Sequence, residues 1–127
     1  MAQNGQRPQK ILVVDDDHTT LELLETYLGR AGFQVITAKD GSEAVTMAVL
    51  EMPQIILLDI LMPSVGGVAA LKQLKGLEIT KAIPVIIITA GGQVGAQKEC
   101  EQNGANAFMI KPLSPAKLLA VINSLLE

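Results

Sequence analysis

The acidic residues that could do chemistry stand where apolar runs end. Asp15 and Asp16 directly follow Ile11–Val14, and Asp59 directly follows Ile55–Leu58. Continuous branched apolar runs are typical of strands that are buried on both faces of a parallel sheet. Open parallel sheets bind ligands beyond the carboxyl ends of their strands, so we expect these carboxylates to face one another across a single crevice.

Carboxylates this close need a cation, because each close pair repels by as much as about 4 kcal/mol at an effective dielectric constant of about 20. Oxygen ligands without paired Cys or His favour Mg²⁺ with several retained waters. Two further strand ends add a hydroxyl, Thr89, and an ammonium, Lys111. A carboxylate beside Mg²⁺, a hydroxyl and a lysine is equipped for phosphoryl transfer, because the cations neutralise the phosphoryl oxygens. The predicted product is an acyl phosphate on Asp59.

The hydrophobic pattern predicts five strands that alternate with five helices. The strands are expected at 10–14, 33–38, 55–59, 84–90 and 106–110. The helices are expected to begin at Asp17 or Thr19, at Asp40–Ser42, at Gly66 or Gly67, at Gln93 and at Ser114. Because the first, third and fourth strands are the most apolar, we place them in the centre of the sheet. The predicted fold is a flavodoxin-like, doubly wound, parallel α/β sheet with strand order 2-1-3-4-5 and five helices on two faces.

Apolar positions at helical spacing predict which helix faces lie against the sheet. They are Leu21, Leu24, Leu28 and Ala31; Ala44, Val45, Ala48, Val49 and Met52; Val68, Leu71 and Leu74; and Leu118, Leu119, Ile122, Leu125 and Leu126. The segment 93–103 has few apolar positions, and Gly95 lies in its first turn. We therefore expect it to be the least stable helix.

The composition bounds the class of protein. The chain has 127 residues, which suits one domain over residues 10–127 after a polar, flexible tail over residues 1–9. The net charge of −3 and the 2% of aromatic residues argue against direct nucleic-acid binding. The apolar runs are too short to insert into a membrane, and the N-terminus lacks a signal-peptide pattern. A single cysteine, Cys100, favours a reducing compartment, so we expect a cytoplasmic protein.

Four ordered motifs resemble the response-regulator receiver domain of two-component signalling. They are Val13–Asp16, Asp59–Pro63 with Gly67, Thr89-Ala90 and Lys111-Pro112, and the likeness covers about 10–127. The resemblance implies a chemotaxis-receiver-like signalling module, not an enzyme. Asp59 would accept a phosphoryl group from a histidine kinase or phosphotransfer protein. Asp15, Asp16 and Asp59, with the backbone carbonyl of Leu61, would hold Mg²⁺.

The same resemblance assigns the response to phosphorylation. Thr89 would be the switch hydroxyl, Lys111 the cation that pairs with phosphate, and Phe108 the aromatic residue whose rotamer reports the state. It also implies a cis Lys111-Pro112 bond and a face, made by the fourth helix, fifth strand and fifth helix, that changes partner. The downstream partner is unknown, and the chain is expected to be either a stand-alone receiver or part of a longer regulator.

Two positions depart from the family pattern. Leu61 and Gly91 stand two residues beyond Asp59 and Thr89, and neither side chain can orient an attacking water. We therefore predict slow self-dephosphorylation.

Two other functions compete with this interpretation. Asp15 to Thr19 also resembles the Asp-x-Asp-x-Thr motif of haloacid-dehalogenase-like phosphatases, with Asp15 as nucleophile and Asp17 as acid and base. That mechanism needs a late acidic metal motif, and the only acid beyond Lys111 is Glu127. The other alternative is a degenerate receiver that acts only as an interaction module, against which the intact acid and lysine pattern argues.

Overall fold

The computed structural model describes residues 8–60, 66–90 and 95–127. A five-stranded parallel sheet has the order β2-β1-β3-β4-β5, which confirms the predicted topology. The elements are β1 (Lys10–Val14), α1 (His18–Arg30), β2 (Gln34–Ala38), α2 (Gly41–Glu51), β3 (Ile55–Asp59), α3 (Gly67–Gly76), β4 (Val85–Thr89), α4 (Ala96–Gln102), β5 (Ala107–Ile110) and α5 (Pro115–Leu126). Part of the predicted tail, residues 1–7, lies outside the described residues.

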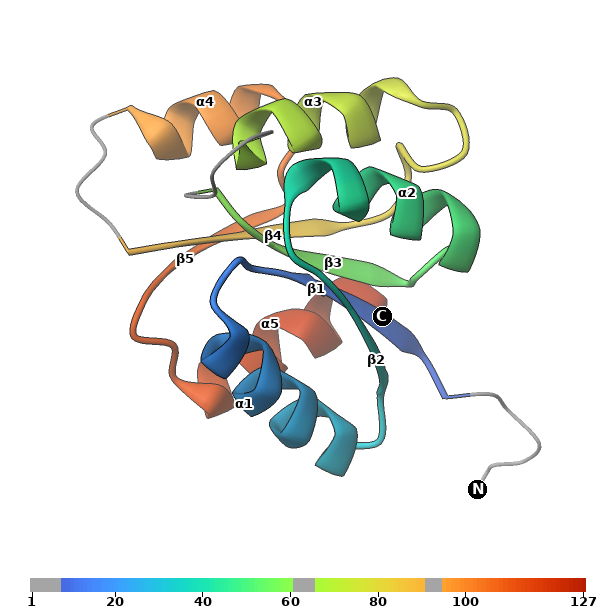
Figure 1. Cartoon of the computed structure of the whole chain (residues 1–127). Helices are drawn as coiled ribbons and strands as arrows, with labels where there is room; N and C mark the ends of the chain where they lie inside the picture. Colours follow the sequence, from blue (N-terminus) through green and yellow to red (C-terminus); the bar gives the residue numbers. More distant parts are fainter. Residues whose placement is uncertain (1–7, 61–65, 91–94) are drawn as a thin grey trace.

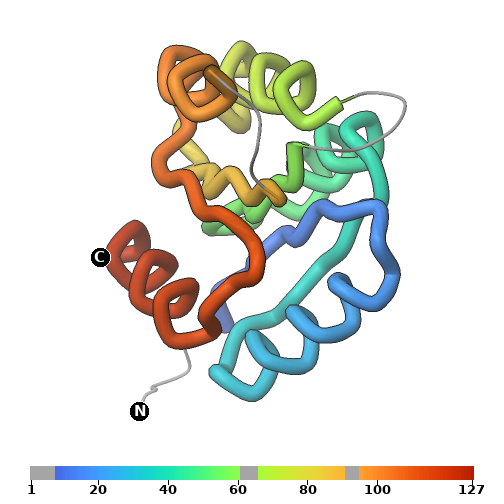
Figure 2. The backbone as a smooth tube through the Cα atoms, turned by 90° about the vertical axis from the view of Figure 1, so that its left-hand side faces the viewer, coloured from blue at the N-terminus to red at the C-terminus, as the bar shows by residue number. Residues whose placement is uncertain are grey.

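The helices cover the sheet in two layers. α1 and α5 lie below the sheet in Figure 1, and α2, α3 and α4 lie above it. Figure 2 shows the same separation from the side. Alternate residues of the central strands enter opposite cores: Leu12 and Leu58 face α2 to α4, whereas Val13 and Leu57 face α1 and α5. Both faces of these strands are therefore buried from solvent, which explains their unbroken apolar runs.

The register of the sheet brings the carboxyl ends of the strands level with one another. Val14 pairs with Leu58, so the next residue of each strand, Asp15 and Asp59, follows at the same height. Asp59 in turn pairs with Ile88 of β4. The acids that are distant in sequence are thus placed at one edge of the sheet by strand pairing alone.

Local capping explains where several helices begin. In α2, Asp40 accepts a hydrogen bond of 2.8 Å from the Glu43 N–H, the usual role of an acid at an N-cap. In α5, Ser114 caps the helix and Pro115 occupies its first turn, as predicted. Gly95 precedes α4 with a φ of 84°, and the described helix there has only seven residues. The predicted start at Gln93 lies outside the described residues.

The predicted apolar face of α2 is wrong at two positions. Ala44 and Ala48 are fully buried, but Val49 is 37% and Met52 is 42% exposed. Val49 is one residue beyond Ala48, about 100° further around the helix, and so lies outside the buried stripe. Met52 follows the last helical residue, Glu51, and has the left-handed conformation that ends the helix.

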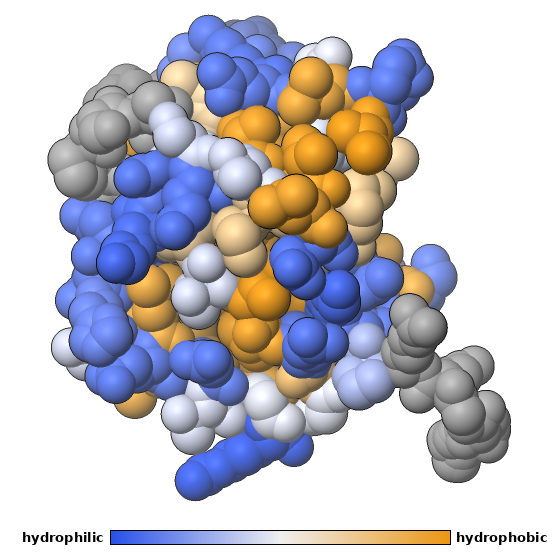
Figure 3. All heavy atoms as spheres, turned by 45° about the vertical axis from the view of Figure 1, so that its right-hand side comes forward, coloured by the Kyte–Doolittle hydropathy of each residue, from blue (hydrophilic) through white to orange (hydrophobic). Residues whose placement is uncertain are grey.

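Exposed apolar side chains gather where α2 ends and α3 connects to β4. They include Leu50, Met52, Leu77 and Ile79, and Figure 3 shows apolar surface on this face. This is the rim at which β3 and β4 begin, opposite to the ends that carry the acids. Across residues 8–60, 66–90 and 95–127, no helix has both the length and the apolar character needed to cross a membrane.

Candidate functional site

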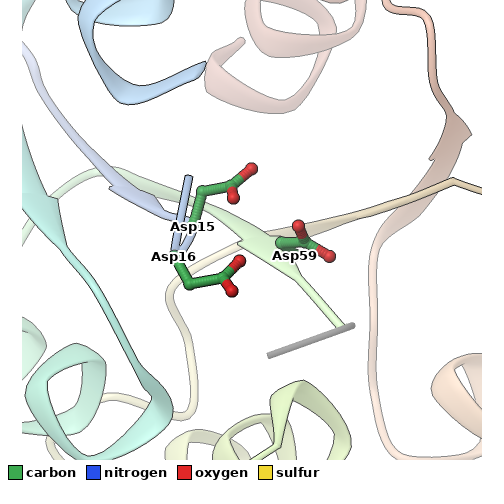
Figure 4. A group of neighbouring side chains, drawn as sticks. All are labelled: Asp15, Asp16 and Asp59. Carbon is green, nitrogen blue, oxygen red and sulfur yellow. The ribbon is translucent and has the colours of Figure 1, made fainter. Parts of the chain in front are cut away.

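Three carboxylates meet at the carboxyl ends of β1 and β3. Oxygen atoms of Asp15, Asp16 and Asp59 all lie within 4.8 Å of one another. In Figure 4, Asp15 and Asp16 extend from the end of β1 toward Asp59 on β3. Asp15 and Asp59 are only 3% and 5% exposed, whereas Asp16 is exposed. The cluster therefore has a buried base and one acid open to solvent.

Lys111 supplies a positive charge to the cluster from the end of β5. Its Nζ donates to Asp15 Oδ2 at 3.0 Å and to Asp59 Oδ2 at 3.1 Å. Burial by itself lowers the pKa of Lys111, but the hydrogen bonds and charges of the two carboxylates outweigh it and hold the pKa above its usual value. The backbone fixes this residue as well, because its N–H donates to the Thr89 carbonyl at 2.7 Å. The Lys111-Pro112 bond is cis, as predicted.

The neighbouring acid, Asp17, is separate from this cluster. Its backbone N–H donates to Asp15 Oδ1 at 2.9 Å, while its side chain accepts the Thr20 hydroxyl at 2.7 Å. That hydroxyl, ahead of the other influences, lowers the pKa of Asp17. Asp17 is the N-cap residue of α1, as predicted, although its side chain caps no backbone N–H. Its backbone thus orients Asp15, while its carboxylate is held at the start of α1.

The remaining predicted residues lie on β4 and β5 or outside the described residues. Thr89 ends β4 and is 1% exposed, one strand away from Asp59. Phe108 on β5 is half-buried and packs against the core beneath α2 to α4. Leu61 and Gly91 both lie outside the described residues, so the metal-binding carbonyl and the two departures from the family pattern stay predictions.

An apolar groove beside the cluster was missed by sequence reasoning. It has a volume of about 750 Å³, and its lining includes Leu23, Tyr27, Leu113 and Lys111. Leu23 is 67% exposed and stands outside the periodic stripe of α1, which is why the spacing of apolar residues gave it no role. The signal available in the sequence was a large apolar residue outside that stripe. Lys111 therefore borders both the groove and the carboxylate cluster.

Comparison with known proteins identifies the family. The model of the response regulator receiver domain matches residues 11–123. The chain belongs to this family. The resemblance drawn from four motifs is therefore confirmed, and the protein is a receiver domain of two-component signalling, a signalling module. Family membership favours this function over the phosphatase-like alternative.

Two curated relatives differ in how much of their length the receiver domain spans. It is 41% identical over 119 residues to the probable transcriptional regulator ycf27 of Cyanophora paradoxa, covering 94% of this chain and 48% of that protein. It is 38% identical over 117 residues to protein PilH of Pseudomonas aeruginosa, covering 92% of this chain and 97% of that one. The chain thus spans about half of the first relative and nearly all of the second.

A solved structure shows the same fold with a metal in its site. The receiver domain of a sensor histidine kinase from Pseudomonas aeruginosa PAO1 superposes with a TM-score of 0.87 and 28% sequence identity, over 94% of this chain and 98% of that one. That protein has a magnesium ion coordinated in its active-site cleft. The flavodoxin-like architecture predicted from the sequence is therefore confirmed.

Proposed function

We propose that this receiver domain accepts a phosphoryl group on Asp59 from a histidine kinase or phosphotransfer protein, in the cytoplasm and with Mg²⁺. One observation carries the proposal: Asp59 is buried, yet it contacts the Lys111 ammonium and lies within 4.8 Å of two more carboxylates. A nucleophilic carboxylate needs this combination of restricted water access and nearby positive charge to bring a phosphoryl group close.

The residues present fit Mg²⁺. Three carboxylates and one ammonium leave a formal charge of −2 in the cluster, which a divalent cation would balance. The donor atoms are all oxygen, which a hard cation prefers, and Asp16 keeps the cluster open to the waters that Mg²⁺ retains. Asp15, Asp16 and Asp59 would hold the ion, with the predicted Leu61 carbonyl. When bound, Mg²⁺ would neutralise charge on the phosphoryl oxygens.

The chemistry is a displacement at phosphorus. A carboxylate oxygen of Asp59 attacks, a new O–P bond forms, and the P–N bond of the donor phosphohistidine breaks, with its electron pair leaving on the imidazole. Lys111 and the Thr89 hydroxyl would bind oxygens of the transferred group. The product carries a charge of about −1.5 to −2 where a single carboxylate charge stood before.

That added charge would drive the switch. Lys111 already contacts Asp59, and Thr89 ends the adjacent strand, so a phosphoryl group on Asp59 would bind the Lys111 ammonium and draw the Thr89 hydroxyl toward β3. Phe108 would then move into the space that Thr89 vacates, and the surface of α4, β5 and α5 would change its affinity for a downstream protein. Because residues 61 and 91 are Leu and Gly, the phosphorylated state should hydrolyse slowly.

Intact-mass spectrometry tests the proposal. The protein is incubated with a small acyl phosphate with and without Mg²⁺, as wild type, Asp59→Asn and Asp17→Asn. The last is a matched control, since Asp17 makes the same change of charge outside the cluster. We expect one phosphoryl group that requires Mg²⁺ and is lost only in Asp59→Asn. Phosphate released continuously through Asp15 would indicate a phosphatase, and the absence of both signals an interaction module.

A further inference from the structure

Gly67, the first residue of α3, lies directly against the strand end that carries Asp59. A Cβ atom built on Gly67 would stand 2.3 Å from Ile60 Cα and 2.6 Å from the Asp59 carbonyl oxygen. Both are backbone atoms, so no side-chain rotation can make room. We infer that Gly67 is a positioning residue, whose missing side chain lets α3 seat against β3 and hold Asp59 in place; this rests on the proposed role of Asp59.

Space, rather than backbone conformation, is what Gly67 provides. It does not have the positive φ that favours glycine, which is found instead at Gly32, Gly95 and Gly104. Ordinary contacts of a Cβ atom begin at 3.4 Å, so a methyl group at position 67 requires a displacement of about 1 Å. The neighbouring Gly66 differs, because a Cβ there would meet nothing within 4 Å.

The strand end is the part that would yield. α3 is anchored by Ala70, Leu71 and Leu74, all fully buried, so lifting the helix would open the core along its length. Ile60 lies one residue beyond the end of β3, and its N–H bonds to the Ile88 carbonyl at 3.2 Å. Moving the last residues of one strand disturbs fewer contacts than moving a packed helix.

A displacement of Asp59 would reach the reacting groups directly. Asp59 now lies 3.1 Å from the Lys111 ammonium and within 4.8 Å of the other two carboxylates. A shift of about 1 Å takes the Lys111 contact out of hydrogen-bonding range. Misplacement by about 1 Å can cost about 100-fold in rate, because the reacting atoms lose their alignment.

The test compares Gly67→Ala with Gly66→Ala. Both replace a glycine by alanine in the same loop and helix start, and only the first meets backbone. We measure the rate of phosphorylation by a small acyl phosphate at saturating Mg²⁺, and the Mg²⁺ affinity by calorimetry, at a temperature where circular dichroism shows each variant to be folded. We expect Gly67→Ala to be about 100-fold slower and to bind Mg²⁺ more weakly, with Gly66→Ala within about twofold of wild type.

A third variant separates position from stability. Leu74→Ala removes a buried side chain at the far end of α3 and leaves the Asp59 backbone untouched. If Leu74→Ala lowers the melting temperature as much as Gly67→Ala and slows phosphorylation as much, the inference is overturned. It is also overturned if folded Gly67→Ala reacts at the wild-type rate, or if Gly67→Ala cannot be folded even in sucrose, since the requirement would then be one of folding.

Failure of the proposed function would look different. Wild-type protein would then show no phosphorylation at all. In that case Gly67→Ala and Gly66→Ala are compared by their Mg²⁺ affinity and by the changes in the amide chemical shifts of Asp59 and Ile60 relative to wild type. Larger shifts and weaker Mg²⁺ binding in Gly67→Ala than in Gly66→Ala would still support the positioning role. Equal values in both variants would refute it.

Discussion

Replacing Lys111 by methionine would isolate the role of its ammonium in the metal-free protein. Nζ now contacts Asp15 at 3.0 Å and Asp59 at 3.1 Å, and both carboxylates are at least nine-tenths buried. Methionine keeps an unbranched, apolar stem and loses the charge. The variant therefore leaves two buried carboxylates without the cation that they share.

The burial of this ion pair and its screening by solvent set the expected loss in the free energy of unfolding. Removing one partner of a buried ion pair costs about 3–5 kcal/mol. The Lys111 side chain is 28% exposed, so solvent screens part of that charge and we expect a loss of about 2 kcal/mol. For a domain of 127 residues this corresponds to a fall in melting temperature of about 6–10 °C.

Mg²⁺ should reverse much of that loss, because the ammonium and the metal compete for the same carboxylates. We expect Lys111→Met to bind Mg²⁺ about tenfold more tightly, which corresponds to about 1.4 kcal/mol. At a concentration 100 times the wild-type Kd, Mg²⁺ then stabilises the wild type by about 2.7 kcal/mol and the variant by about 4.1 kcal/mol.

Thermal unfolding with and without Mg²⁺ measures both effects. Lys117→Met is the matched control, since Lys117 is an exposed lysine in the first turn of α5. It should change the melting temperature by less than about 2 °C. The stabilising role of the Lys111 ammonium is refuted if metal-free Lys111→Met melts at the wild-type temperature. Its competition with Mg²⁺ is refuted if Mg²⁺ raises the melting temperature of the variant no more than it raises that of the wild type.

Three further predictions follow from the same charges and burial. Asp16→Asn should raise the melting temperature of the metal-free protein by about 2–4 °C, because it removes the repulsion between Asp16 and the carboxylates of Asp15 and Asp59. A lower melting temperature in calorimetry would contradict repulsion among the three acids. The pKa of Lys111 is raised by folding, so the stabilisation by Lys111 is complete below the usual pKa of 10.5 and is lost as pH rises through the higher folded value. Above pH 10.5, the melting temperature of the wild type should therefore fall more steeply with pH than that of Lys111→Met, as measured by thermal unfolding at a series of pH values. Burial raises the pKa of the fully buried Cys100 thiol, so a thiol reagent at pH 8 should label it only on unfolding, and rapid labelling of the native protein would refute its packing.

The sequence alone predicted the architecture, and it indicated which residue types would gather at the site. Five apolar runs predicted the strands, and the most continuous of them predicted the centre of the sheet. Helix starts at Gly66 or Gly67 and at Ser114 could be read from local residue types. These features are local, because strand periodicity, capping and turn chemistry each depend on residues within a few positions. The proximity of the acids followed from the predicted topology, because the carboxyl ends of parallel strands lie at the same edge of the sheet.

Only the tertiary structure decided how those residues meet. Lys111 lies 96 residues from Asp15 and 52 from Asp59, yet its ammonium contacts both, whereas Asp17, two residues from Asp15, bonds to Thr20 instead. No local pattern specifies which of several adjacent acids turns inward. The exposure of Val49 and the lack of room for a Cβ atom at position 67 likewise depend on how closely a helix approaches the sheet. That approach is set by the packing of complete elements, because the contacts that fix it come from residues far apart in the chain.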